Sequence, residues 1–183
     1  ALPPNASARW NTYVASAMEP QKDFAELLAL FTEHEVEYAI VGGYALAFHG
    51  APRSTGDLDL LVRPTRANAE RIVRALADFG FASLGLQVQD FLQPDRVVQL
   101  GYPPVRIDLI TSLSGVSWDQ VSAGAVAGEY GAVPARFIGR QDRHGVPREQ
   151  PGEDRIPGLG IEIVGRPLPV AGQEIHFRRA CLQ

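Results

Sequence analysis

The sequence predicts an α+β (α/β) fold, because helical and strand-like segments alternate along one chain. One helical stripe consists of Phe24, Leu27, Leu28 and Phe31, at positions i, i+3, i+4 and i+7. Short apolar runs bounded by turn residues indicate strands at 38–41, 57–62 and 105–110. The chain has 183 residues, 45% of them hydrophobic, which favours one main domain.

In the first half, a helix is expected from Pro20, followed by the strand 38–41. The glycine pair 42–43 is expected to turn the chain into a short helix over 44–49. An Arg-Ser-Thr-Gly loop then leads into the strand 57–62. These elements are short and closely spaced, as in a compact sheet with helices packed on it.

In the second half, two further helices are expected, with Thr65 and Ser117 as their N-caps. The first of these helices ends at Gly80, a residue type common just past a helix C-terminus. The remaining strand-like runs are 97–100, 105–110 and 135–138, and a Gly-Tyr-Pro-Pro turn joins the first two as a hairpin.

The two ends differ in character from the middle. Residues 1–17 lack periodicity, and we expect a non-native or flexible extension with Met18 as the natural start. The main domain is expected over 18–139. Residues 140–183 are dense in glycine, proline and arginine, and we expect an irregular tail or a small edge hairpin. The change in composition is typical of a frameshifted or truncated C-terminus, or of a naturally divergent tail.

Charge and cysteine content argue against several classes of protein. The net charge of −4 is unlike that of a nucleic-acid coat protein, although it leaves a local basic patch open. Cys181 is the single cysteine, so no internal disulfide can form and a cytoplasmic location is expected. No apolar run approaches the roughly 20 residues that span a bilayer, so no membrane contact is expected.

Three aspartates lie inside strand-like apolar runs. Asp57 and Asp59 are two residues apart, so on a strand both side chains point to one face. Asp108 can join them from a neighbouring strand. Burying carboxylates is unfavourable unless a cation or hydrogen bonds compensate. The arrangement therefore predicts Mg²⁺, and three such carboxylates can hold two ions roughly 3.5–4 Å apart.

A phosphate-binding loop is expected beside these aspartates. Gly42 and Gly43 lack Cβ atoms, so their backbone can approach a ligand closely. The unpaired N–H groups of the following helix favour anions. Arg53, Ser54 and Thr55 lead into the strand and are within reach of phosphate oxygens. For Arg53, a surface ion pair is an equally good interpretation.

Together, the segments Val41–Gly43, Arg53–Leu60 and Arg106–Leu109 resemble the nucleotidyltransferase superfamily that includes DNA polymerase β. The shared pattern is a glycine turn, Asp-hydrophobic-Asp and a later strand with a third aspartate. Within that superfamily the chain is similar to small bacterial stand-alone members, including antitoxin-type nucleotidyltransferases. The resemblance covers roughly residues 20 to 138.

The resemblance implies a nucleotidyltransferase fold, with a mixed sheet and helices packed on it. It also implies that Asp57 and Asp59 ligate the metal, while Asp108 completes the site and helps to activate the nucleophile. Gly42 and Gly43 would hold the nucleotide phosphates. The implied reaction is Mg²⁺-dependent transfer of a nucleoside monophosphate from an NTP to a hydroxyl acceptor, with release of pyrophosphate.

Several alternatives stay open at this point. The acceptor is a tRNA, a protein or a small molecule. The chain is alternatively an antitoxin or regulatory module with a cognate toxin and little catalysis, or an antibiotic-modifying transferase. A further interpretation is structural: Asp57 and Asp59 are merely hydrated at a strand end, and Asp108 forms a salt bridge with Arg106 or Arg53.

Overall fold

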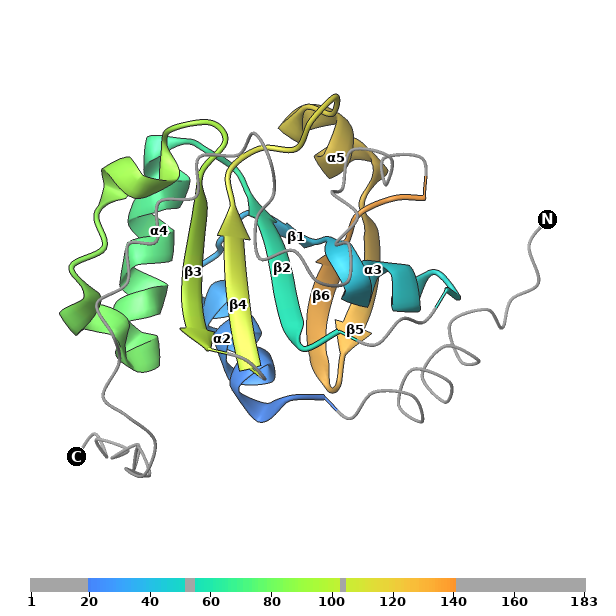
Figure 1. The fold of residues 1–183 in the computed structure, drawn as a ribbon, viewed down its shortest axis with the longest axis horizontal. Helices are drawn as coiled ribbons and strands as arrows, with labels where there is room; N and C mark the ends of the chain where they lie inside the picture. The colour runs from blue at the N-terminus through green and yellow to red at the C-terminus, as the bar shows by residue number, and fades with distance from the viewer. Residues whose placement is uncertain (1–19, 52–54, 103–104, 141–183) are drawn as a thin grey trace.

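The computed structural model describes residues 20–51, 55–102 and 105–140, which form a six-stranded sheet with helices packed on it (Figure 1). The strand order is β3-β4-β2-β1-β6-β5. Strand β2 runs parallel to β4 and antiparallel to β1, so the sheet is mixed, as predicted. The strands are β1 (Tyr38–Ile40), β2 (Asp57–Val62), β3 (Val97–Tyr102), β4 (Val105–Ile110), β5 (Val126–Tyr130) and β6 (Val133–Phe137).

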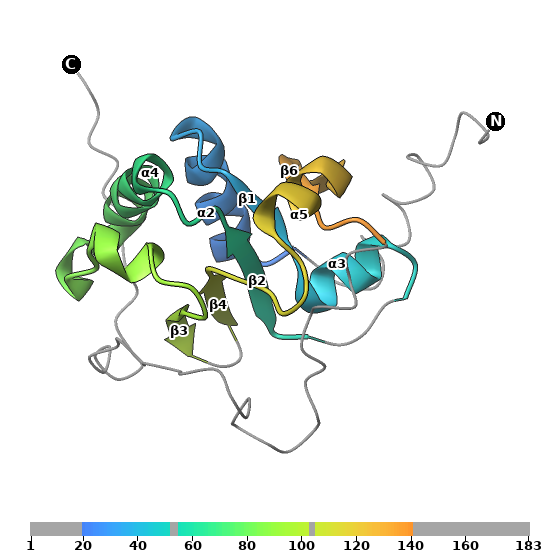
Figure 2. The same ribbon diagram turned by 90° about the horizontal axis from the view of Figure 1, so that it is seen from above.

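Four α-helices accompany the described part of the sheet: α2 (Lys22–Glu33), α3 (Gly42–Phe48), α4 (Arg66–Leu76) and α5 (Trp118–Gly124). Helix α2 lies behind the strands in Figure 1 and α4 stands to the left of β3, while the view from above in Figure 2 places both helices on the same side of the strands. Helix α3 lies in front of the sheet, where β1 ends. Among the described residues, no helix lies over the front face of β2 and β4 (Figure 1).

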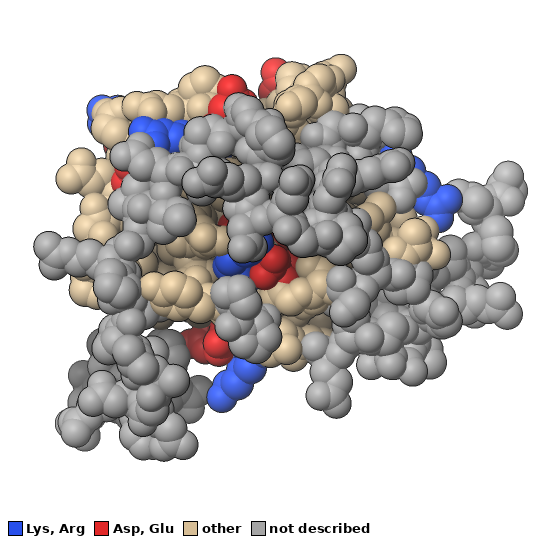
Figure 3. Space-filling view, in the orientation of Figure 1, with Lys and Arg blue, Asp and Glu red and all other residues tan. Residues whose placement is uncertain are grey.

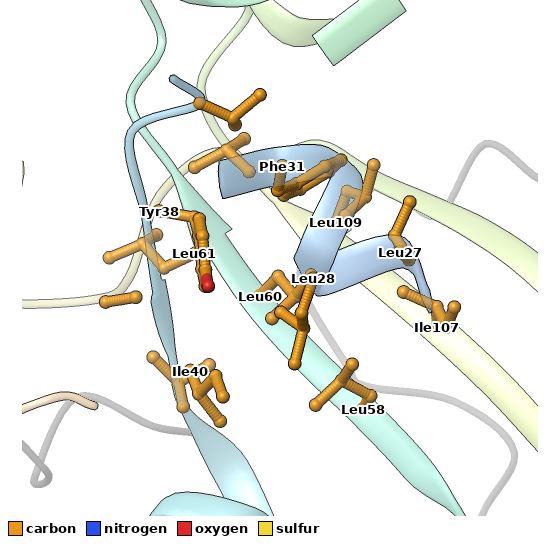
Figure 4. Packing of buried hydrophobic residues seen from close by; sticks show 14 of the residues in the cluster. Leu27, Leu28, Phe31, Tyr38, Ile40, Leu58, Leu60, Leu61, Ile107 and Leu109 are labelled. Atoms are coloured by element: carbon orange, nitrogen blue, oxygen red, sulfur yellow. The ribbon is translucent and has the colours of Figure 1, made fainter. Parts of the chain in front are cut away.

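The core lies between the sheet and α2. The predicted stripe of α2 is fully buried, with Leu27, Leu28 and Phe31 pointing toward the strands (Figure 4). From β2, the buried Leu58 and Leu60 meet this stripe. Because side chains alternate along a strand, the residues between these leucines face away from the core. The hydrophobic layer thus determines which face of β2 carries its aspartates.

Both predicted N-caps are present. The Thr65 hydroxyl accepts a hydrogen bond from the Asn68 backbone N–H at the start of α4. Ser117 and Gln120 form a reciprocal capping box on α5. The chain leaves α4 through a turn in which Gly80 has a φ of 102°, close to the helix end predicted at that glycine.

The structure corrects three details of the expected elements. Helix α3 begins at Gly42, so the glycine pair forms its first turn and does not precede it. Strand β5 was not expected, because its apolar residues are weakly patterned and mostly exposed. The last strand covers Val133–Phe137, two residues earlier than the expected start, because it pairs with β5 as a hairpin.

The terminal segments 1–17 and 141–183 lie outside the described residues, so the expected domain limits stay predictions. Across the described ranges, no helix combines the length and the apolar character needed to cross a bilayer.

Candidate functional site

The parallel pairing of β2 with β4 brings the three predicted aspartates together. In this register Asp59 lies beside Asp108, and Asp57 lies beside Arg106. Asp57 and Asp59 are partly buried and lie on the face opposite the buried Leu58. The three carboxylates therefore come from two neighbouring strands and share one face of the sheet.

Gly42 lies directly against the Asp59 side chain. The backbone passes from β1 into α3 at this residue with a φ of +60°, in the left-handed region that favours glycine. A Cβ at this position would collide with the Asp59 carboxylate. The β1–α3 turn therefore brings its backbone against one of the candidate ligands, which is the close approach that the glycine pair predicts.

Gly43 makes a similar approach to the loop before β2. A Cβ added at Gly43 would lie 2.6 Å from Cγ2 of Thr55. The Thr55 hydroxyl donates to the Asp57 carbonyl at 3.2 Å and accepts from its N–H at 3.3 Å. The structure thus joins Thr55 to the glycine turn, whereas Arg53 and Ser54 lie outside the described residues.

A cation also lies among the aspartates. Nη2 of Arg106 is 2.6 Å from Oδ2 of Asp57, and Nε is 3.2 Å from Oδ1 of Asp108. With the amide of Gln99 oriented to satisfy its neighbours, its oxygen accepts from Nε of Arg106 at 2.8 Å and from Nη1 at 3.2 Å. Basic and acidic side chains meet over β2 and β4 near the middle of the face shown in Figure 3.

Asp108 is the most buried of the three aspartates, with 8% of its surface exposed. Burial raises the pKa of Asp108 to about 6; Arg106 opposes this rise, and the nearby Asp57 carboxylate adds to it. Its Oδ1 is buried and accepts no well-aligned hydrogen bond from the described residues, although Arg106 lies within ion-pair distance. Asp108 is thus a buried acid with unused acceptor capacity.

Sequence reasoning identified only part of this network. It offered Arg106 as one of two salt-bridge partners for Asp108, and the structure contains that pair. It missed Gln99, which pairs with Asp108 across β3 and β4. The available signal was a polar amide in an otherwise apolar strand. Tyr44, at the start of α3, is buried in edge contact with Phe24 and is a core residue.

The types of donor at the site suit a hard divalent cation. Carboxylate oxygens are the ligands that Mg²⁺ prefers, and the buried Oδ1 of Asp108 has capacity for one. As placed, no three His, Cys, Asp or Glu side chains among the described residues are gathered closely enough to hold an ion. Instead, the Arg106 guanidinium supplies the positive charge between Asp57 and Asp108.

Comparison with known proteins gives one family. A family model described as "Nucleotidyl transferase AbiEii toxin, Type IV TA system" matches residues 25–133. This range is more than half of the chain and contains every residue of the site described above. No curated protein matches the chain. A crystal structure from Thermotoga maritima, provisionally described as a nucleotidyltransferase, aligns with a TM-score of 0.45 at 11% identity, over 66% of this chain and 78% of that one.

Proposed function

The chain belongs to the AbiEii nucleotidyl transferase family, and we propose that it transfers a nucleoside monophosphate from an NTP to a hydroxyl acceptor in a Mg²⁺-dependent reaction. Membership of the family supports nucleotidyltransferase activity in general. The use of Mg²⁺, of an NTP and of a hydroxyl acceptor is what we propose. The observation that carries it is the parallel register that sets Asp59 beside Asp108, with Asp57 on the same face.

In the proposed reaction the acceptor hydroxyl attacks the α-phosphorus of the NTP. The bond from that phosphorus to the bridging oxygen breaks, and pyrophosphate leaves. Asp108, which lies beside Asp59 in the register of β2 and β4, accepts the proton of the hydroxyl. Two Mg²⁺ ions, held by Asp57, Asp59 and Asp108, would lower the pKa of the hydroxyl and neutralise the leaving group.

The remaining residues of the site bind phosphate. We assign the phosphates to the backbone of Gly42 and Gly43, which form the first turn of α3, where unpaired N–H groups favour anions. The Thr55 side chain adjoins this turn, with its hydroxyl hydrogen-bonded to the Asp57 backbone, and belongs to the same proposed set. Arg53 and Ser54, which precede it in the chain, complete the proposed phosphate-binding set.

The test of this proposal is nucleotide transfer from each of the four α-³²P-labelled NTPs to tRNA, total RNA and protein fractions. We expect Mg²⁺-dependent labelling that the double variant Asp57→Asn/Asp59→Asn abolishes, together with Mg²⁺–NTP binding. The matched control is Asp119→Asn/Glu129→Gln, which removes two exposed carboxylates elsewhere on the surface. If the wild type labels no acceptor and binds Mg²⁺–NTP no better than the double aspartate variant, the proposal is wrong.

The family description favours a second, compatible role as the toxin of a toxin–antitoxin pair. We propose that the transfer reaction arrests growth and that a cognate antitoxin protein counters it. Induced expression in a bacterial host should then slow growth, and the Asp57→Asn/Asp59→Asn variant should not. Co-expression of a neighbouring antitoxin gene should restore growth. Equal growth with the wild type and the double variant would contradict this role.

A further inference from the structure

Arg106 connects three neighbouring strands at the site. From β4, its guanidinium reaches Asp57 on β2, Asp108 on its own strand and Gln99 on β3. The side chain is 23% exposed, so this cation is held largely within the protein. Guanidinium groups present several donors in a rigid fork, which allows one arginine to bind several acceptors at once.

Two of the partners of Arg106 are also two of the three proposed metal ligands. Oδ2 of Asp57 lies 2.6 Å from the guanidinium, and Oδ1 of Asp108 lies 3.2 Å from it. A divalent ion bound to the same carboxylates would lie close to a positive guanidinium in a partly buried environment, where charge repulsion is strong. The ion and the guanidinium therefore compete for the same negative charge.

We propose that Arg106 is an exchangeable internal counter-ion, which holds Asp57 and Asp108 together without metal and releases them when a divalent ion binds. This inference rests on the proposed metal site and concerns a positioning residue, not one that contacts the reacting atoms. The Gln99 amide oxygen, which is not one of the proposed metal ligands, remains as an acceptor for the displaced guanidinium. Arg106 thus keeps the ligands in register and lowers their affinity for metal.

The alternative is a permanent ion pair with a purely structural role. In that case, neutralising Arg106 would change stability and leave metal affinity unaltered. The exchange model makes a different prediction: removing the competing charge strengthens metal binding, even as the metal-free protein loses stability. Metal affinity therefore distinguishes the two models where stability alone does not.

The experiment titrates the EDTA-treated full chain with Mn²⁺ and follows free Mn²⁺ by electron paramagnetic resonance. For Arg106→Gln we expect a dissociation constant about tenfold lower than that of the wild type. Arg106→Lys retains the charge and should bind Mn²⁺ with affinity close to that of the wild type. The matched control is Arg63→Gln, which breaks the 2.9 Å ion pair with Glu37 and should leave Mn²⁺ affinity unchanged.

A second measurement is made on the wild type, with a variant used only to assign the resonance. The ¹⁵Nε–¹H resonance of Arg106, assigned by its disappearance in Arg106→Lys, should shift when the wild type is saturated with Mg²⁺. An unshifted resonance contradicts the exchange model, and so does a Mn²⁺ affinity of Arg106→Gln that is equal to or weaker than that of the wild type. In either case, metal binding by the wild type would still agree with the proposed function. If neither protein binds Mn²⁺, the exchange and the proposed metal site are both wrong.

Discussion

The absence of one Cβ determines how closely the β1–α3 turn approaches the Asp59 carboxylate. Gly42 satisfies two conditions at once, since its φ of +60° favours glycine and its missing side chain leaves room for Asp59. Either condition alone is common in proteins. Their coincidence at a candidate ligand links the Gly-Gly motif to the aspartates in physical terms.

Gly42→Ala should therefore impair metal binding and nucleotide transfer by more than its effect on stability explains. The left-handed backbone destabilises an alanine by roughly 1–2 kcal/mol, and the new methyl group displaces Asp59. Gly85→Ala is the control, because Gly85 has a φ of +69° and nothing within 4 Å of an added Cβ. Denaturant unfolding should show a loss of stability in both variants, larger in Gly42→Ala, and Mn²⁺ titration a binding defect only in Gly42→Ala. Equal binding in both variants would contradict the packing argument.

At the level of residues, the sequence predicted which side chains form the site better than it predicted which of them contact one another. The alternation of Arg106 with Asp108 places both on one face of a strand, and Arg106 is one of the two ion-pair partners that the sequence suggests for Asp108. The second partner, Asp57, depends on the parallel register between β2 and β4. That register is a property of the folded sheet, and no local pattern encodes it.

Elements are joined to the site by buried polar contacts as well as by the core. Asn68 of α4 is 1% exposed, and its Oδ1 accepts from the Glu37 N–H at 2.8 Å. Its Nδ2 donates to the carbonyls of Glu37 at 2.9 Å and Arg63 at 3.0 Å. One side chain thus ties α4 to the segment before β1 and to the end of β2.

Asn68→Ala should destabilise the protein by about 2–3 kcal/mol, because it leaves several backbone groups without partners in a buried environment. Glu70→Ala on the same helix removes an exposed 3.6 Å pair with Arg66 and should change stability by less than about 0.5 kcal/mol. Urea unfolding monitored by circular dichroism measures both. A loss for Asn68→Ala no larger than that for Glu70→Ala would show that the bridge contributes little.

Elements with strong local signals were predictable, and those defined by partners were not. Helix α2 has four apolar residues on one stripe, and Thr65 and Ser117 are capping residues by type. Strand β5 has no such signal. It is an edge strand that exists through its pairing with β6, and its residue Val126 remains 41% exposed.

For the molecule as a whole, burial of the site conflicts with the negative charge that the site carries. The layer between α2 and the sheet consists of buried hydrophobic side chains, and the same sheet carries Asp108 with only 8% of its surface exposed. A buried carboxylate opposes folding in its charged form, and Arg106 offsets only part of this effect, since the pKa of Asp108 remains raised. Global stability should therefore depend on the charge of the site.

This dependence predicts a specific response to pH. In the unfolded chain an aspartate has a pKa of about 3.9, whereas burial raises that of folded Asp108 to about 6. Between these values the folded state binds more protons, so the free energy of unfolding contributed by Asp108 falls as pH rises from about 4 to 6. The fall is at most roughly 3 kcal/mol and is complete above the folded pKa.

Urea unfolding of the wild type and Asp108→Asn in EDTA, from pH 4 to 8, isolates this contribution, because other titrating groups are common to both proteins. The wild-type stability minus that of Asp108→Asn should decrease from pH 4 to 6 and then level off; a constant difference would contradict the raised pKa. Saturating Mg²⁺ should reduce or reverse the decrease, because an ion that binds ionised Asp108 stabilises the folded state where the carboxylate is charged.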